Sequence, residues 1–568
     1  MSIKGFLLSD KKRTGLIISI IFFVIGISFL YVFTFQADPS NPYTIKHITL
    51  LSEEDDTRIS ALVYTPKNTS GRHPGIVVGH GFCESKQFMN VLSIELVKRQ
   101  FVVISIDYRG HGSSDGYLDQ IRENRSSLLG DEIAAVNYLK SLPYVDNDIG
   151  LIGHSMGGGV ATTLAAKFPD EFNATVCLGS IPSAPNTNKI QNLLIALGPF
   201  EQSATRDRAI EYLSYHINKS NPVIGELYGD FDYNNASKVF IGGATEHLFV
   251  PQNSKIINET VNWFEVAFYD SIRWPITLTS DLNLVFYIMT ICGLIGINFV
   301  VMIILSNYLW KNKPFLPRKN IVKDRSISGL ILYYFLVEVF SFMGLIAFQN
   351  IFTDILPVSL GNALFSELVG IFIGVIVVSY FAILRKENLS ITKLPSKMNK
   401  LISKNWGRSM IFSILSAVVF ITSITLATTW SNSPILLTTR EIGAIIGMTI
   451  LFFPLLMFKE FYYRTIQSKL KTKHKIIEYF EMLGIAVFID NILVIPIMLF
   501  AWGNTPISFM ALALFVFILF SIIQQIITTW VYMYSGRNIV GSTLFISIMY
   551  AWMIVNFFPF GFAMSLIH

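Results

Sequence analysis

The sequence predicts a chain of two parts: an α/β unit with a mostly parallel sheet, followed by an all-α bundle of transmembrane helices. Hydrophobic residues make up 52% of its 568 residues and charged residues only 15%, so the chain is more apolar than an ordinary soluble protein. The excess lies in residues 282–562, whereas residues 40–270 have the composition of a soluble domain. Within residues 40–270, short apolar strands alternate with helical segments, which is typical of a parallel sheet covered on both faces.

The N-terminal apolar run, residues 16–35, follows three basic residues, Lys11, Lys12 and Arg13. A helix of about 20 residues rises about 30 Å, which is the thickness of the hydrocarbon core of a bilayer. A cleaved signal peptide has a shorter apolar region of about 7–15 residues, followed by a cleavage site of small residues. We therefore expect an uncleaved transmembrane anchor over residues 16–36, after a cytoplasmic tail formed by residues 1–15.

Eight further apolar runs predict about eight more transmembrane helices over residues 280–568, nine in all. The runs begin near Leu282, Ile327, Leu360, Met410, Ile442, Phe480, Ile507 and Ile539. Every second loop is rich in Lys and Arg, namely residues 310–326, 385–408 and 459–475, whereas the opposite loops contain one basic residue, Arg440. Because basic loops stay on the cytoplasmic side, the N-terminus should be cytoplasmic and residues 40–270 extracytoplasmic.

The α/β unit, residues 40–270, is expected to begin with two strands around an acidic turn and then to alternate between strands and helices. The expected strands are residues 43–51, 57–64, 75–79, 101–106, 149–153, 174–179, 192–197 and 238–242. The expected helices are residues 84–99, 123–141, 156–168, 203–216 and 253–268. Neither the three cysteines nor the acidic residues form a pattern that predicts a metal or cofactor site, and at most one disulfide, Cys83–Cys177, is possible in this unit.

The strongest chemical motif is Gly153-His154-Ser155-Met156-Gly157, a Gly-x-Ser-x-Gly pattern between an expected strand and an expected helix. In this setting the turn is tight, and the two glycines let the strand and the helix close around the serine. The serine hydroxyl is then held at the carboxyl end of the sheet, beside the N-terminus of a helix, which stabilises negative charge. We therefore expect Ser155 to be a nucleophile.

A second motif, Val78-Gly79-His80-Gly81-Phe82, ends the expected strand 75–79. Together with the serine motif, it makes residues 45–270 resemble the α/β-hydrolase superfamily. The resemblance implies that the backbone N–H groups of Phe82 and Met156 form an oxyanion hole, in which one donor is typically worth about 3 kcal/mol. It also implies structural roles for the His80 side chain and for residues 107–114, so we expect no chemistry from Asp107 or His111.

The resemblance further implies the chain order nucleophile, acid, histidine. His247 follows the last expected strand and precedes the last expected helix, so it is the expected general base. Placing His247 at the acid position instead would leave no later histidine before His474, which lies in the bundle. The acid should follow the strand 192–197, where Glu201 stands in place of the usual Asp. Three alternatives for this role stay open: Asp230, Asp232 and Glu246.

These residues predict a serine hydrolase that cleaves a carboxylic ester, including a lipid-linked one, a thioester or an amide through an acyl-enzyme. The expected substrate is a small molecule, a lipid or a peptide. The clusters of Lys and Arg are explained by membrane topology, so no nucleic-acid partner is expected, and the oligomeric state is not readable from the sequence.

Two other functions stay open: a transporter or channel with a regulatory or degenerate hydrolase domain, and a membrane acyltransferase. Acidic residues in or near the apolar runs could line a transport path or pair with neighbours such as Arg464 and orient helices. These residues are Glu338, Glu367, Glu460 and Asp490.

Overall fold

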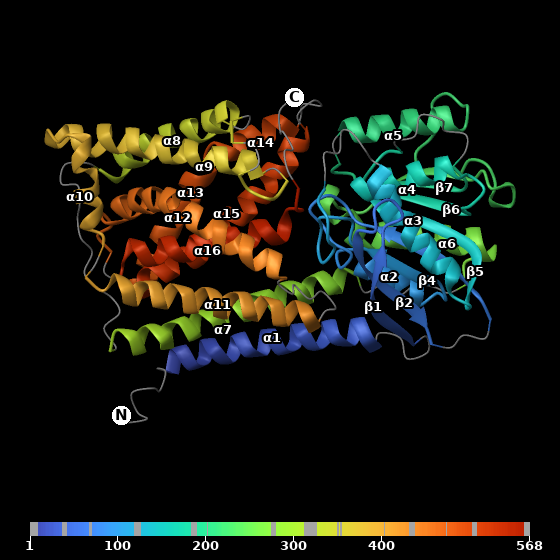
Figure 1. Ribbon diagram of the computed structural model, residues 1–568, viewed down its shortest axis with the longest axis horizontal. Coiled ribbons are helices and arrows are strands. Elements are labelled where there is room, and N and C mark those ends of the chain that lie inside the picture. Colours follow the sequence, from blue (N-terminus) through green and yellow to red (C-terminus); the bar gives the residue numbers. More distant parts are fainter. Residues whose placement is uncertain are drawn as a thin grey trace.

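We describe the protein from a computed structural model of the chain, in which an α/β unit lies at one end of a long helical bundle (Figure 1). The described residues are 10–36, 42–67, 71–118, 126–182, 190–201, 203–273, 280–311, 326–348, 351–352, 355–359, 361–402, 404–430, 438–472, 474–502 and 508–561. The two parts correspond to the α/β segment and the apolar segment expected from the sequence.

The α/β unit is built on an eight-stranded sheet in the order β1-β2-β4-β3-β5-β6-β7-β8. The strands are β1 (Tyr43–Leu51), β2 (Arg58–Pro66), β3 (His73–Gly79), β4 (Val102–Ile106), β5 (Val145–His154), β6 (Ala174–Leu178), β7 (Leu193–Leu197) and β8 (Ser237–Ile241). β2 is antiparallel to both of its neighbours, β1 and β4, and the other pairs are parallel. β4, β6 and β7 are buried along their whole length, as apolar strands covered on both faces should be. The mostly parallel sheet is confirmed.

Helices cover both faces of this sheet (Figure 1). α2 (Asn90–Val97) and α6 (Ser254–Tyr269) share one apolar core with the sheet. On the other face, α3 (Ser126–Ser141), α4 (Met156–Lys167) and α5 (Ser203–His216) share a second core. Two short helical turns, η3 (Phe231–Tyr233) and η4 (His247–Gln252), flank β8.

The expected helix 84–99 is wrong at its start, because residues 84–89 form turns and α2 begins only at Asn90. The Glu84 N–H donates to the carbonyl of Gly81, and the Lys86 N–H donates to the Asp107 carboxylate. These bonds draw the segment back toward the end of β3 and away from a helical path. Cys83 and Cys177 are free thiols, so the disulfide that the sequence allowed is not formed.

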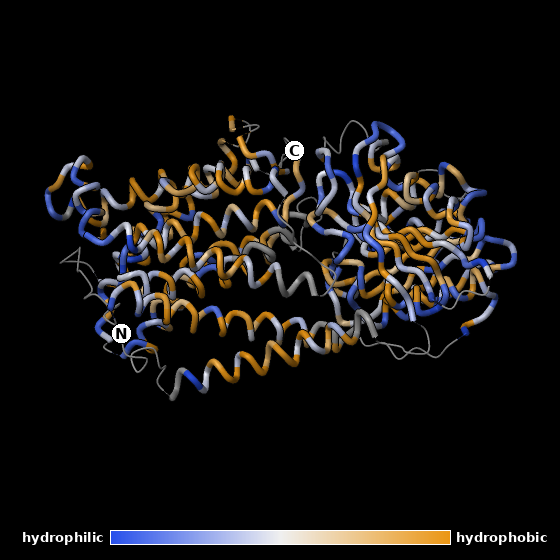
Figure 2. The backbone as a smooth tube through the Cα atoms, turned by 60° about the horizontal axis from the view of Figure 1, so that its bottom comes forward, coloured by the Kyte–Doolittle hydropathy of each residue, from blue (hydrophilic) through white to orange (hydrophobic). Residues whose placement is uncertain are grey.

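The bundle consists of long apolar helices that run roughly alongside one another (Figures 1 and 2). The helices are α1 (Asp10–Gln36), α7 (Ser280–Leu309), α8 (Ile327–Phe348), α9 (Gly361–Ser379), α10 (Leu394–Asn399), α11 (Trp406–Trp430), α12 (Thr439–Gln467), α13 (Lys475–Asn491), α14 (Val494–Trp502), α15 (Ser508–Tyr534) and α16 (Ile539–Phe557). Between α9 and α10 lie three short turns, η5 (Tyr380–Leu384), η6 (Arg385–Glu387) and η7 (Ile391–Lys393). α8 and α9 approach closely at Gly344, where a Cβ would lie 2.5 Å from the Cα of Gly370.

Seven of these helices are long and apolar enough to cross a membrane, and the bent pair α13–α14 would make an eighth span, counting only the described residues. Nine spans were expected from the sequence. The run expected from Ile507 falls on α15, and the early side chains of that helix lie outside the described residues. Hydrophilic segments gather at the end of the bundle that lies away from the α/β unit (Figure 2).

Two of the four acidic residues noted in the apolar runs, Glu460 and Asp490, have basic partners inside the bundle, whereas Glu367 accepts a hydrogen bond from Ser341. Lys459 Nζ lies 3.0 Å from Asp490 Oδ1, and Arg464 lies 2.9 Å from Glu460. Lys459 and Arg464 were expected in a loop that spans residues 459–475, and that boundary is wrong: α12 continues to Gln467. The helix persists because these charged side chains are paired in the interior, where an unpaired charge would be costly.

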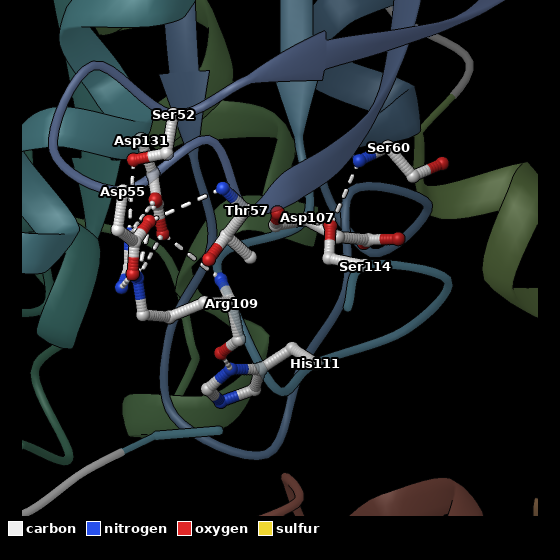
Figure 3. A network of polar contacts seen from close by, with 9 residues as sticks. All are labelled: Ser52, Asp55, Thr57, Ser60, Asp107, Arg109, His111, Ser114 and Asp131. Atoms are coloured by element: carbon white, nitrogen blue, oxygen red, sulfur yellow. Dashed lines mark hydrogen bonds and ion pairs between the residues drawn. The ribbon is translucent and has the colours of Figure 1, made fainter. Parts of the chain in front are cut away.

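A buried arginine ties the segment after β4 to the first hairpin and to α3 (Figure 3). Arg109 Nη2 lies 2.7 Å from Asp131 Oδ1, and Arg109 Nη1 lies 2.8 Å from Asp55 Oδ2. The same guanidinium donates to the Ser52 hydroxyl at 2.9 Å. Asp131 is fully buried, so its carboxylate depends on Arg109 for charge compensation.

We predict that Arg109→Ala lowers the free energy of unfolding by about 3–5 kcal/mol, because it leaves the Asp131 carboxylate buried without its partner. The matched control is Arg58→Ala, which removes an exposed ion pair with Asp115 on the same loop and should cost less than about 1 kcal/mol. Thermal unfolding of the full chain in detergent measures both. Equal small losses in the two variants would contradict the prediction.

Candidate active site

The expected nucleophile lies on a sharp turn between β5 and α4. Ser155 has φ 50° and ψ −111°, a region that residues with side chains rarely adopt. The turn requires glycine on both sides: a Cβ on Gly153 would lie 2.0 Å from the carbonyl oxygen of Gly157, and a Cβ on Gly157 would lie 2.7 Å from the carbonyl oxygen of Gly79. The serine hydroxyl therefore stands at the carboxyl end of β5, beside the first turn of α4.

The structure brings the three expected side chains of the triad together from three segments of the chain. His247 Nε2 lies 3.0 Å from Ser155 Oγ. On the other side of the ring, His247 Nδ1 lies 3.1 Å and 3.2 Å from the two carboxylate oxygens of Glu201. Glu201 follows β7, and His247 begins the turn η4 after β8, so both side chains come from the carboxyl edge of the sheet.

Two of the three alternative acids, Asp230 and Glu246, accept hydrogen bonds from nearby backbone N–H groups, and the third, Asp232, is exposed in η3. Asp230 accepts a hydrogen bond from the Asp232 N–H at the start of η3, on an exposed part of the unit. Glu246 accepts from the N–H groups of Leu248 and Phe249 and thereby caps η4. Glu201 has the geometry expected of the third member of the triad.

The surroundings of His247 favour its protonated form. Burial by itself lowers the pKa of this imidazole, but the hydrogen bond to Glu201 and the negative charge of Glu201 outweigh burial, and the net pKa is raised above its usual value. Glu84 and Glu246 add smaller contributions in the same direction. An imidazolium formed when Ser155 loses its proton would thus be stabilised.

The two expected oxyanion donors, the N–H groups of Phe82 and Met156, belong to segments that follow two neighbouring strands, β3 and β5. Met156 is the first residue of α4, directly after the nucleophile, and Phe82 follows β3, where β3 pairs in parallel with β5. Neither backbone N–H donates to an acceptor among the described residues. Both donors are therefore available to an oxygen atom placed between them and Ser155.

A second histidine–carboxylate pair, which the sequence reasoning missed, supports this arrangement. The His154 Nδ1 atom lies 2.9 Å from Glu84, and its Nε2 atom lies 3.0 Å from the backbone carbonyl oxygen of His247. Glu84 also accepts a hydrogen bond from the Gly81 N–H at 2.7 Å. Through these contacts, Glu84 and His154 connect three segments: the oxyanion loop (residues 80–82), the turn that carries Ser155, and His247. An acidic residue three positions after Gly81, together with a histidine directly before Ser155, was the available signal.

His80 and His111 lie in the structural shell beneath the oxyanion loop. The His80 Nε2 atom accepts the Tyr108 N–H and therefore carries no proton, so Nδ1 donates to the Gly81 carbonyl. Burial lowers the pKa of this ring, which agrees with that assignment. Burial, with the nearby His80, lowers the pKa of His111 to about 3. Asp107 forms a buried ion pair with Lys86 and accepts the Ser113 N–H. These contacts agree with the structural roles that were expected for them.

The edge of the sheet that carries these residues faces the helical bundle (Figure 1). The turn η4, which begins with His247, contacts helix α7. The loop after β4 accepts hydrogen bonds from Arg440, the second residue of α12. The candidate site therefore lies close to the junction between the α/β unit and the bundle.

Comparison with known proteins agrees with this geometry. Residues 72–224 match the family model described as serine aminopeptidase, S33. A monoacylglycerol lipase of Mycolicibacterium smegmatis is 31% identical over 147 residues, which cover 25% of this chain and 48% of the lipase. A serine hydrolase-like protein of Mus musculus is 26% identical over 125 residues, which cover 22% of this chain and 38% of that protein. The chain spans less than half the length of these relatives.

Among solved structures, the esterase Pf2001 of Pyrococcus furiosus matches 39% of this chain and 92% of its own, with 17% sequence identity and a TM-score of 0.31. The family model, together with the order of the strands, defines an α/β-hydrolase domain in the matched region. The resemblance seen in the sequence is confirmed for the fold of this domain. The bundle lies outside the region matched by the family model.

We predict that Glu201→Gln lowers kcat/KM by about 10³- to 10⁴-fold, because the imidazole loses the partner that orients it. Since Glu201 raises the pKa of His247, the acid limb of the pH profile should also move to lower pH in the variant. Asp230→Asn is the matched control and should leave the rate and the profile unchanged. Loss of activity in the control, with Glu201→Gln still active, would assign the acid to Asp230 instead.

Proposed function

We propose that this protein is a membrane-anchored serine hydrolase that cleaves a carboxylic ester, a thioester or an amide through an acyl-enzyme on Ser155. The observation that carries the proposal is the hydrogen-bonded series Ser155 Oγ, His247 and Glu201, with both contacts close to 3 Å. The α/β-hydrolase domain and the serine hydrolases among its relatives support it.

In the proposed reaction, Ser155 Oγ attacks the substrate carbonyl carbon while its proton moves to His247 Nε2. Glu201 holds the Nδ1–H and stabilises the imidazolium. The N–H groups of Phe82 and Met156 donate to the oxyanion, and His247 then gives its proton to the leaving alcohol, thiol or amine. Water, deprotonated by His247, attacks the acyl-enzyme, releases the acid and restores Ser155.

We propose that α1 and the long helices of the bundle span the membrane, with α13 and α14 forming one bent span and the short α10 excluded, and that the hydrolase domain lies on the extracytoplasmic side. The apolar lengths of seven helices support spanning. The Lys- and Arg-rich segments between helices support the orientation, because the hydrolase domain and the hydrophilic end of the bundle lie at opposite ends (Figure 2).

A lipid-linked ester is the substrate class that the position of the site favours. Two aromatic side chains beside the triad are exposed: Phe200, which precedes Glu201, is 58% exposed, and Phe249, two residues after His247, is 39% exposed. Because this edge of the sheet faces the bundle, an acyl chain leaving the bilayer would meet an apolar rim. The relative named monoacylglycerol lipase supports an acyl ester of this kind.

We predict that a fluorophosphonate probe labels the purified full-length protein, because only an activated serine reacts rapidly with it. Ser155→Ala and His247→Ala should lose labelling almost completely. Ser141→Ala, at the exposed end of α3, is the matched serine control and should be labelled like the wild type. The measurement is in-gel fluorescence, with thermal unfolding to establish that each variant is folded.

A folded wild-type protein that stays unlabelled would overturn the proposed function. If it is labelled, hydrolysis of glycerol esters of graded chain length, compared with thioesters and amides, identifies the substrate class. Preference for long acyl esters over all amides is the result expected for a lipid-linked substrate.

A further inference from the structure

The last described residues of the chain enter the hydrolase domain. Phe560, just after α16, pairs through its backbone with the β4 loop, the segment 107–118 that follows β4. Its N–H donates to the Gly110 carbonyl at 2.8 Å, and its carbonyl accepts the Leu118 N–H at 2.7 Å. The approach depends on small residues, since a Cβ on Gly110 would lie 2.5 Å from the Phe560 carbonyl oxygen. The bundle thus supplies a short β-like pairing to both ends of this loop.

A second contact from the bundle reaches the middle of the same loop. Arg440, in the first turn of α12, donates to the Gly116 carbonyl at 3.0 Å and to the Ser114 carbonyl at 3.2 Å. Its guanidinium also lies over the Phe560 ring, 3.9 Å from the centroid. α12 and the end of α16 therefore hold the β4 loop jointly.

The opposite side of the β4 loop supports the oxyanion loop. The Tyr108 N–H donates to His80 Nε2 at 3.1 Å, and His80 Nδ1 donates to the Gly81 carbonyl at 2.7 Å. The His111 ring packs edge-on against His80 and against Phe82, with centroids 4.9 Å and 6.1 Å apart. Moving the β4 loop would therefore move the residues that carry the Phe82 N–H.

Hydrogen bonds join the start of the β4 loop to its middle. The Ser114 hydroxyl donates to the Asp107 carbonyl and accepts the N–H of Ser60 on β2 (Figure 3). The Asp107 carboxylate also accepts the Ser113 N–H. The segment that Arg440 binds, at Ser114 and Gly116, is thus bonded to Asp107, the residue directly before Tyr108.

We propose that Arg440 is a positioning residue for the oxyanion hole: through the β4 loop, it and the Phe560 pairing hold the Phe82 N–H in place, so the catalytic centre is complete only when the hydrolase domain is docked on its bundle. This inference rests on the proposed function. It gives the bundle a part in catalysis that anchoring alone would not require.

The test is Arg440→Ala in the full-length, detergent-solubilised protein, assayed with p-nitrophenyl butyrate, a soluble ester that needs no access from the bilayer. Active sites are counted by fluorophosphonate titration. We expect kcat per titrated site to fall by about 10- to 100-fold with little change in KM, because a misplaced donor weakens stabilisation of the transition state. Arg440→Lys, which keeps the charge and one donor, should recover part of the rate.

A trifluoromethyl ketone distinguishes positioning from mere stability, because its adduct with Ser155 carries an oxyanion in the same hole. Its affinity should fall in parallel with kcat. Arg408→Ala, an exposed arginine at the opposite end of the bundle near the start of α11, is the matched control and should leave both values unchanged. If Arg440→Ala does not fold, Gly561→Ala serves instead, since its Cβ would lie 2.6 Å from the Leu118 carbonyl oxygen and should produce the same losses.

Unchanged kcat per site and unchanged ketone affinity in the tested variant would overturn the inference, even if its melting temperature falls. In that case the wild type would still be labelled by the fluorophosphonate probe, because its serine would still be active. If the proposed function itself is wrong, the wild type and every variant stay unlabelled, so the two failures are distinguishable.

Discussion

Ser155 has a backbone conformation that a residue with a side chain adopts at a cost of about 1–3 kcal/mol, and the edge of the sheet is organised around it. Its N–H donates to the Leu178 carbonyl on β6 at 2.8 Å, and its carbonyl accepts the Gly159 N–H in α4. Those bonds, with the two flanking glycines, let β5 end and α4 begin within one residue. The hydroxyl therefore projects toward Glu201 and His247, which follow the carboxyl ends of β7 and β8.

Charge around this turn is arranged in two linked pairs. Glu201 pairs with His247, and Glu84 pairs with His154, whose Nε2 atom contacts the backbone of His247. Both carboxylates contribute to raising the pKa of His247. Burial strengthens both pairs, because the low dielectric of the interior does not screen them as water would. His247 is thus held through its side chain and through its own backbone carbonyl.

Much of the fold could be predicted from the sequence, because strands buried on both faces are continuous apolar runs that stand out between polar helices, as β4 and β7 do. The serine turn could be located because its chemistry demands glycine at fixed positions. The acid was harder to predict, since any of several acidic residues after β7 or β8 could serve. Only their distances to His247 at the carboxyl edge of the folded sheet distinguish Glu201 from the others. The structure places Glu201 within hydrogen-bonding distance of the ring, while its role in catalysis stays a prediction.

Other features could not be predicted because they depend on partners far away in the sequence. The end of α12 was missed because Lys459 looks like a loop residue until Asp490, on α13, is seen to pair with it. His154 occupies a position where the serine motif accepts any residue, so the available signal, this histidine and the acidic residue after Gly81, gained meaning only when the structure placed Glu84 beside it. The contacts of Arg440 could not be predicted either, because its partners Ser114 and Gly116 lie in the hydrolase domain. In the sequence, Arg440 is notable only as the one basic residue in the loops expected on the extracytoplasmic side.

The bond between Arg440 and Ser114 joins residues 326 positions apart in the sequence. Domains of a growing chain fold roughly in the order of their synthesis, and contacts of large sequence separation form late. The hydrolase domain can therefore collapse around its own sheet while most of the bundle is still being made. The β4 loop gains its remaining hydrogen bonds only after α12, and finally the segment beyond α16, have been inserted. A chain stalled before that point would carry a folded but incompletely braced hydrolase, so the order of biogenesis itself would delay activity until the whole protein is assembled.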